Sequence, residues 1–165
     1  MGALRMLRHT FAEGSARRKF SASVLDTIQK VIAAGERRHS GQVMFAVEGA
    51  LPALDLARGR SARERAHEVF AHLRVWDTQH NSGVLVYVLL ADHAIEILAD
   101  RGIAAKVGEA EWKSIVTQMQ QRFTAGEFER GAVEGVGAVN DILARHFPAD
   151  GAPRANELPD RPVVL

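Results

Sequence analysis

The apolar run of residues 84–90, VLVYVLL, sets the first limit on how this chain can fold. It is apolar on both faces and rich in β-branched residues, which is typical of a central strand covered on both sides. The run extends only to Ala91, whereas a membrane-spanning helix needs about 20 apolar residues, so we expect no transmembrane segment. A turn at Asp92 and His93 separates it from a second apolar run, residues 94–99. The two runs predict an antiparallel hairpin.

Two helices and one more strand are predicted before this hairpin. The alternation of residues 42–48 predicts a buried strand, and apolar residues at helical spacing predict a helix over residues 23–35. Ser61 and Glu64 form a capping box, which marks the start of an amphipathic helix. If this helix is a crossover between the strands at 42–48 and 84–90, those two strands run parallel.

Two helices are predicted after the hairpin, over residues 112–123 and 128–147. Gly131 and Gly135 lie four residues apart on one face of the second helix, at a cost in helix propensity. We therefore interpret them as a flat strip for close packing. The whole pattern predicts an α/β fold. Its small mixed central sheet combines a parallel crossover with an antiparallel hairpin, and about four helices flank it.

The 165 residues, of which 47% are hydrophobic, suffice for one core and leave no room for a second domain. We predict an α/β domain over residues 21–148. Residues 1–20 form a basic N-terminal arm, expected to be solvated or loosely docked, with a membrane surface or an acidic partner as its alternative contact. The tail, residues 149–165, holds three prolines and is predicted to be extended. It docks on its own domain or on a partner, or it stays disordered.

Composition excludes several classes of function. Lys and Arg (21) balance Asp and Glu (20), and this near-neutral charge lacks the basic excess of a nucleic-acid-binding protein. The absence of cysteine excludes disulfides, a thiol nucleophile and Cys-ligated zinc. No apolar run of signal-peptide length follows the first basic residues, so we expect a cytoplasmic protein. Neither a P-loop nor a G-x-S-x-G nucleophile elbow occurs.

The predicted topology brings three loops to one edge of the sheet. The two parallel strands start at that edge, and the antiparallel strand ends there. The loops are residues 39–41, residues 77–83, and residues 100–102, which lead towards Glu109. Five side chains on these loops are candidate ligand-binding residues: His39, Asp77, His80, Asn81 and Arg101.

Four side chains at this edge are candidate metal ligands: Asp77, Asn81, Asp100 and Glu109. Carboxylate and amide oxygens suit calcium or magnesium, and the same carboxylates beside Arg101 could bind or hydrolyse a phosphate. Two alternatives stay open. Each residue could simply cap or turn its own loop. Open α/β sheets also tend to bind ligands at the carboxyl ends of parallel strands, which here is the loop of residues 49–59 with Asp55 and Arg58.

Several segments resemble the TPM domain family. They are HNSGVLVYV at residues 80–88, IEILADRGI at 95–103, F-x-x-G-E-F-x-x-G at 123–131, and ERRHSG at 36–41. The resemblance covers roughly residues 24–147 and depends on the order and spacing of these motifs. It implies a central sheet between helices. Family members are often exported or membrane-anchored, are sometimes labelled phosphatase-like, and are implicated in membrane-protein maintenance and receptor association. Some bind calcium through acidic loop residues.

This chain departs from the family pattern at the candidate site. Asn81-Ser82-Gly83 stands where the family has Asp-Asn-Gly, and Asp100-Arg101-Gly102 stands where Gly-Tyr-Gly is common. Glu109 matches an acidic position early in the next helix. One carboxylate is lost and an arginine is gained, which weakens the expectation of calcium binding and of hydrolysis.

The resemblance is to a short cytoplasmic branch of the family. Together with the incomplete acidic site, the basic arm and the extended tail, it leads us to expect a non-enzymatic interaction module. Such a module would act near membranes or with a membrane-associated protein partner. The alternative is a metal-dependent phosphatase-like hydrolase.

Overall fold

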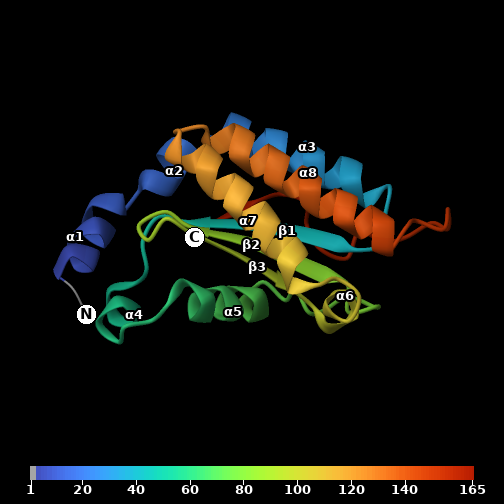
Figure 1. Cartoon of the computed structure of the whole chain (residues 1–165), viewed down its shortest axis with the longest axis horizontal. Helices are drawn as coiled ribbons and strands as arrows, with labels where there is room; N and C mark the ends of the chain where they lie inside the picture. The colour runs from blue at the N-terminus through green and yellow to red at the C-terminus, as the bar shows by residue number, and fades with distance from the viewer. Residues whose placement is uncertain (1–2) are drawn as a thin grey trace.

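The computed structural model describes residues 3–165, which fold around one four-stranded mixed sheet (Figure 1). The strands are β1 (Gln42–Glu48), β2 (Gly83–Leu89), β3 (Ala94–Ala99) and β4 (Val163–Val164), in the order β3-β2-β1-β4. β1 pairs in parallel with both β2 and β4, while β2 and β3 are antiparallel. The predicted α/β fold, with its parallel crossover and its hairpin, is confirmed.

Four long or medium helices are those predicted from the sequence: α3 (Ala22–Glu36), α5 (Ala62–His72), α7 (Glu109–Thr124) and α8 (Phe128–His146). The described residues form four more: α1 (Ala3–Ala12), α2 (Ser15–Lys19), α4 (Ala53–Ala57) and α6 (Arg101–Ala104). Three of these four have five residues or fewer, too short to show a helical period in the sequence. The capping box of Ser61 and Glu64 is present at the start of α5.

The helices cover the sheet on both faces. Figure 1 shows α3, α7 and α8 on one side of the strands and α5 on the other. Alternate residues of β1 point into two separate cores: Val43, Phe45 and Val47 pack on the α3, α7 and α8 side, and Met44 and Ala46 on the α5 side. β2 is buried along its whole length, as expected for a strand covered on both faces.

Two glycines of α8 allow that helix to lie close to α7. A Cβ on Gly131 would lie 2.7 Å from the ring of Phe123, and one on Gly135 would collide with the side chain of Met119. The interpretation of these glycines as a flat packing strip is therefore confirmed. Gly35 of α3 has the same role against α8, because a Cβ there would overlap Asn140.

A charged cluster ties α5 to the sheet. The Arg65 guanidinium donates to both carboxylate oxygens of Glu48, at 3.0 and 2.9 Å, and Tyr87 Oη donates to Glu48 Oε2 at 2.6 Å. Glu48 is only 4% exposed, and a buried carboxylate needs such partners to offset its lost hydration. This cluster fixes α5 over the carboxyl end of β1.

Residues 3–19 belong to the segment expected to be a solvated or loosely docked arm, and hydrogen bonds dock them on the domain. They form α1 and α2, and the buried ring of His9 docks α1 on the domain: Nδ1 accepts from the backbone N–H of Leu51, and Nε2 donates to Asp92 at 3.0 Å. Arg5 also donates to Asp92, at 2.7 Å. The sequence does not reveal this docking because Leu51 and Asp92 lie 42 and 83 residues away from His9.

The C-terminal tail docks in extended form on its own domain. β4 pairs with β1 through Ala46↔Val163 and Val47↔Val164, and the N–H of Leu165 donates to the carbonyl of Val47 at 2.9 Å. Leu158 is buried against the α5-side core. Of the arrangements considered from the sequence, this is the docking in cis.

Candidate functional site

The three predicted loops meet at one edge of the sheet. Register pairs Gln42 with Gly83 at the start of the two parallel strands, and Ala99 at the end of β3 lies opposite Val84. Backbone hydrogen bonds connect the loops, including Gly102 N–H to the carbonyl of Asn81 at 3.0 Å. A Cβ on Gly102 would lie 2.5 Å from the carbonyl oxygen of His80, so a glycine is needed for this close approach.

His39 serves the interior of the protein. Its side chain is buried, with Nε2 3.0 Å from Asn140 Oδ1 and Nδ1 3.1 Å from the carbonyl of Gly41. Asn140 donates its Nδ2 to the carbonyl of Val31, which leaves Oδ1 facing the ring. Both ring nitrogens of His39 thus face acceptor oxygens, and a neutral imidazole can donate to only one of them. Burial lowers the pKa of His39, although the hydrogen bonds to Asn140 and Gly41 oppose this shift. His39 thus links α3, α8 and the start of β1.

The other four candidate ligand-binding residues do not share one environment. Asp77 is exposed and pairs with Arg74 at 2.5 Å. Asn81 adopts a left-handed backbone conformation with φ 51°, which Asn tolerates in turns. Arg101 is exposed at the first residue of α6. His80 borders a pocket beside His39.

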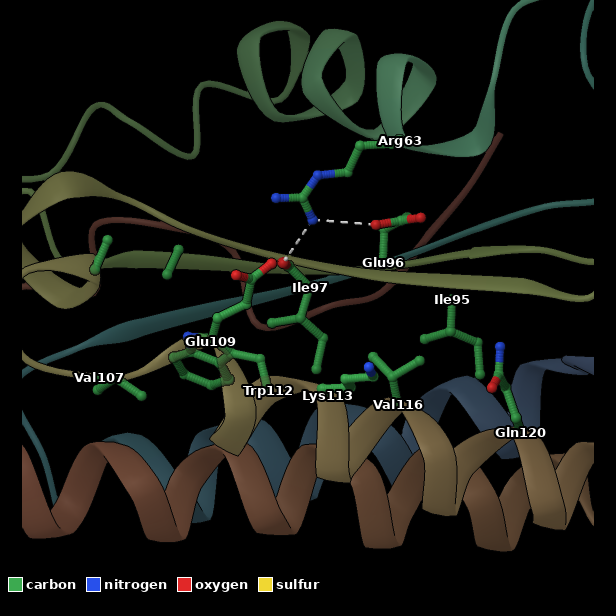
Figure 2. A pocket seen from close by; sticks show the side chains of 12 residues that line it. Arg63, Ile95, Glu96, Ile97, Val107, Glu109, Trp112, Lys113, Val116 and Gln120 are labelled. Atoms are coloured by element: carbon green, nitrogen blue, oxygen red, sulfur yellow. Dashed lines mark hydrogen bonds and ion pairs between the residues drawn. The ribbon is translucent and has the colours of Figure 1, made fainter.

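Asp100 and Glu109 are the two candidate carboxylates nearest the end of β3. Asp100 caps α6, because its Oδ1 accepts from the N–H of Arg101 at 2.7 Å. Its Oδ2 is buried and has no hydrogen-bond partner within the described part of the chain. Glu109 lies at the start of α7, where Figure 2 shows it beside the groove along β3.

The four proposed metal ligands do not all converge. Asn81 and Asp100 adjoin one another through the backbone bonds of their loops, whereas the carboxylate of Asp77 is taken up by Arg74. Over residues 3–165, no three His, Asp or Glu side chains come together in a way that could hold a metal ion. Calcium or magnesium at this edge therefore stays a proposal, for which the buried Oδ2 of Asp100 is the most suitable oxygen.

Sequence reasoning missed a pocket of about 610 Å³ at the same edge. The C-terminal tail forms one wall of it through Glu157 and Asp160, and α3 forms another through Glu36. Gln42 holds the walls together: its Oε1 accepts from the backbone N–H groups of Glu157 and Leu158, both at 2.9 Å. Nothing in the sequence indicates that residues 115 and 116 positions apart would meet in this way.

Glu36 is the most perturbed acid at this edge. Its Oε1 accepts from the N–H of Val43 at 2.7 Å, and its Oε2 accepts from Gln42 Nε2 at 3.3 Å. Burial raises the pKa of Glu36 to about 8, and the charge of Asp160 and a hydrogen bond with it act in the same direction. Glu36 therefore keeps its proton at neutral pH, which removes the charge repulsion between Glu36 of α3 and Asp160 of the tail.

The architecture described above is that of a known family. A family model of the TPM domain matches residues 17–142. The chain belongs to the TPM domain family. The match extends from α2 into α8 and includes every candidate residue at the sheet edge, but not the tail residues Glu157 and Asp160. In this TPM domain protein the pocket at Glu36 is therefore completed by residues outside the matched domain.

A solved structure supports the same fold. The TPM chain is similar to the BA42 protein from the psychrophilic bacterium Bizionia argentinensis, whose structure was determined by NMR. The two are 27% identical and superpose with a TM-score of 0.76, over 87% of this chain and 94% of BA42. No functionally curated protein matches the chain.

The protonated Glu36 should make stability depend on pH. Between its ordinary pKa of 4.5 and about 8, the folded TPM protein binds one more proton here than the unfolded chain, so stability falls as pH rises through this window. Glu36→Gln, which keeps an acceptor for Val43, should lose this fall and exceed the wild type in stability above pH 8. Urea denaturation between pH 5 and 9 measures the difference.

The control is Glu129→Gln, which changes an exposed carboxylate on α8 and should keep the wild-type slope. Parallel stability curves for the wild type and Glu36→Gln across the whole range would show that Glu36 is ionised in the folded protein.

Proposed function

We propose that this TPM domain protein is a non-enzymatic interaction module that binds peripherally to a membrane surface, where it meets a membrane-associated protein partner. The observation that supports the membrane contact is the apolar outer face of α1. Leu4 is 77% exposed, Leu7 54% and Phe11 75%, and Leu54 of α4 is 60% exposed. Large apolar side chains gathered in the open typically mark an interaction surface.

The orientation of α1 is fixed by its opposite face. Residues 4, 7 and 11 lie on one side of a helix, because they are three and seven positions apart. Arg5 and His9 project the other way and bind Asp92. Since these polar contacts dock the helix, its apolar side chains point away from the domain.

Basic residues lie near this apolar face in the chain. Arg8 is half-exposed, and Arg17, Arg18 and Lys19 of α2 are exposed. An amphipathic helix with basic neighbours is the usual means of binding anionic lipid headgroups without crossing the bilayer. No helix within residues 3–165 is long and apolar enough to span a membrane.

Vesicle sedimentation tests the membrane contact. The protein should bind vesicles containing phosphatidylserine more tightly than pure phosphatidylcholine vesicles, and salt should weaken the binding. Replacing Leu4, Leu7 and Phe11 together by Ser should reduce binding at least about tenfold, because three apolar side chains no longer enter the headgroup region.

Trp76→Ser is the matched control, because Trp76 is also a half-exposed apolar residue but lies outside α1 and α4. It should bind vesicles as the wild type does. Equal binding by the triple Ser variant and the wild type, or no binding by the wild type to anionic vesicles, would contradict the proposal.

One observation favours the second candidate, a metal-dependent phosphatase-like hydrolase. The buried Oδ2 of Asp100 has no hydrogen-bond partner in the described chain, and a buried carboxylate oxygen without a partner is costly. A bound calcium or magnesium ion would supply the missing interaction, with the side chain of Asn81 as a neighbouring ligand and Arg101 available for a phosphate.

Thermal unfolding tests this second candidate. Calcium or magnesium should raise the melting temperature in a concentration-dependent manner, because a ligand of the folded state alone stabilises that state. Asp100→Asn, which keeps the α6 cap, should abolish the increase, while Asp26→Asn on the exposed side of α3 should not. An unchanged melting temperature at millimolar metal, with no heat in calorimetry, would leave this candidate without support.

A further inference from the structure

β3 is the outer strand of the sheet, and its outer edge has no strand partner within residues 3–165. Inward-facing and outward-facing backbone groups alternate along an antiparallel edge strand. Asp100 N–H donates to the carbonyl of Gly83, so in β3 the backbone groups of Glu96 and Leu98 also face β2. The N–H and C=O groups of Ile95, Ile97 and Ala99 therefore face away from the sheet.

A groove of about 520 Å³ accompanies this edge. Figure 2 shows β3 between α5, which contributes Arg63, and α7, which contributes Trp112 and Val116. The α7 wall is apolar at these two residues, and the open backbone groups of β3 run along the floor. A groove with a polar strand edge and an apolar wall suits an extended chain whose side chains alternate.

Arg63 partly closes the groove. Its Nη1 donates to the carbonyl of Ile97 at 3.3 Å and to Glu96 Oε2 at 3.1 Å (Figure 2). Ile95 and Ile97 are each only 5% exposed, whereas half of the Arg63 side chain is open to solvent. The guanidinium thus donates to the carbonyl that an added strand would bind. It also protects the edge of β3 against non-specific pairing with strands of other chains.

The sheet already accepts an added strand at its other edge. The two residues of β4 pair with β1, and the prolines of the tail keep the neighbouring backbone extended. The same sheet thus has one edge completed by its own chain and a second edge whose Ile97 carbonyl is bonded by the half-exposed side chain of Arg63. Both hydrogen bonds of Arg63 use Nη1, so its Nε and Nη2 groups can bind a further carboxylate beside Glu96.

We infer that the groove along β3 binds an extended segment of a protein partner by strand addition, with apolar side chains against Trp112 and Val116 and an acidic side chain on Arg63. In the complex, a backbone N–H of the partner replaces Arg63 on the carbonyl of Ile97. The guanidinium keeps its contact with Glu96 and also binds the partner's carboxylate. The inference rests on the proposed role as an interaction module and names the chemistry of its partner.

Two synthetic peptides probe the groove: TVEVEVT, which alternates apolar and acidic residues, and TVKVKVT, in which lysine replaces glutamate. The wild-type protein should bind the acidic peptide about tenfold or more tightly than the basic one, as measured by titration calorimetry. Arg63→Glu should reverse this preference. Arg130→Glu, which changes an exposed arginine of α8, should leave it unchanged.

A second variant tests the backbone contact. Ala99→Pro removes an outward N–H, which an edge strand tolerates, and should weaken the acidic peptide about tenfold without unfolding the protein. Nuclear Overhauser contacts between the peptide backbone and Ile97 should confirm strand addition. Circular dichroism checks that each variant is folded.

Three outcomes would overturn the inference: no binding of either peptide at millimolar concentration, binding that Arg63→Glu does not alter, or a dimer of this chain that pairs its β3 edges. Because α1 lies outside the groove, vesicle binding and peptide binding can fail separately. A failure of vesicle binding therefore does not affect the result for peptide binding, and the reverse also holds.

Discussion

The position of the candidate site and of the C-terminal tail depends on backbone hydrogen bonding on both sides of β1. A buried strand must satisfy its N–H and C=O groups, and β1 is buried along its whole length. β2 meets this need along one side, while on the other side β4 pairs with Ala46 and Val47 and the carboxylate of Glu36 accepts from Val43. The first pairing brings the loops around Asn81 and Asp100 to one edge. The second draws the tail across the domain and places Asp160 beside Glu36.

The two edges of the sheet therefore have different roles. The β1 edge is closed by the chain itself, and the tail that closes it also forms the pocket with Gln42 and the protonated Glu36. The β3 edge has no strand partner within residues 3–165, and Arg63 bonds the carbonyl of Ile97 and the carboxylate of Glu96 there. The apolar face of α1 lies elsewhere on the molecule. These surfaces suit a protein that binds partners, whereas the loops at Asp100 offer few converging ligands.

The sequence was informative where local patterns decide the structure. Alternation over residues 42–48, the apolar run at 84–90 and the capping box of Ser61 predicted the sheet and its crossover. The spacing of Gly131 and Gly135 predicted close packing against another element, which in the structure is α7. Contacts between residues far apart in the chain could not be predicted from these patterns. His9 docks on Asp92, and Gln42 binds the tail, through residues that no periodicity relates.

The candidate site shows the same division. Topology placed its loops at one edge correctly, but loop position does not determine where a side chain points. Asp77 pairs with Arg74, and His39 is buried against Asn140. Each side chain thus binds a nearby partner with matching hydrogen-bonding groups instead of pointing into a cleft shared by the three loops. Glu36 could not have been recognised, since its shifted pKa arises from burial and from a tail more than 120 residues away in the sequence.

Amide hydrogen exchange in the free protein tests most directly whether one sheet edge is closed and the other open. We expect slow exchange for Leu165, whose N–H donates to the carbonyl of Val47. Ile95, Ile97 and Ala99 should exchange faster than the inward-facing Glu96 and Leu98. Exchange of Leu165 at the rate of an unfolded chain, together with equal protection of the five amides of residues 95–99, would contradict this expectation.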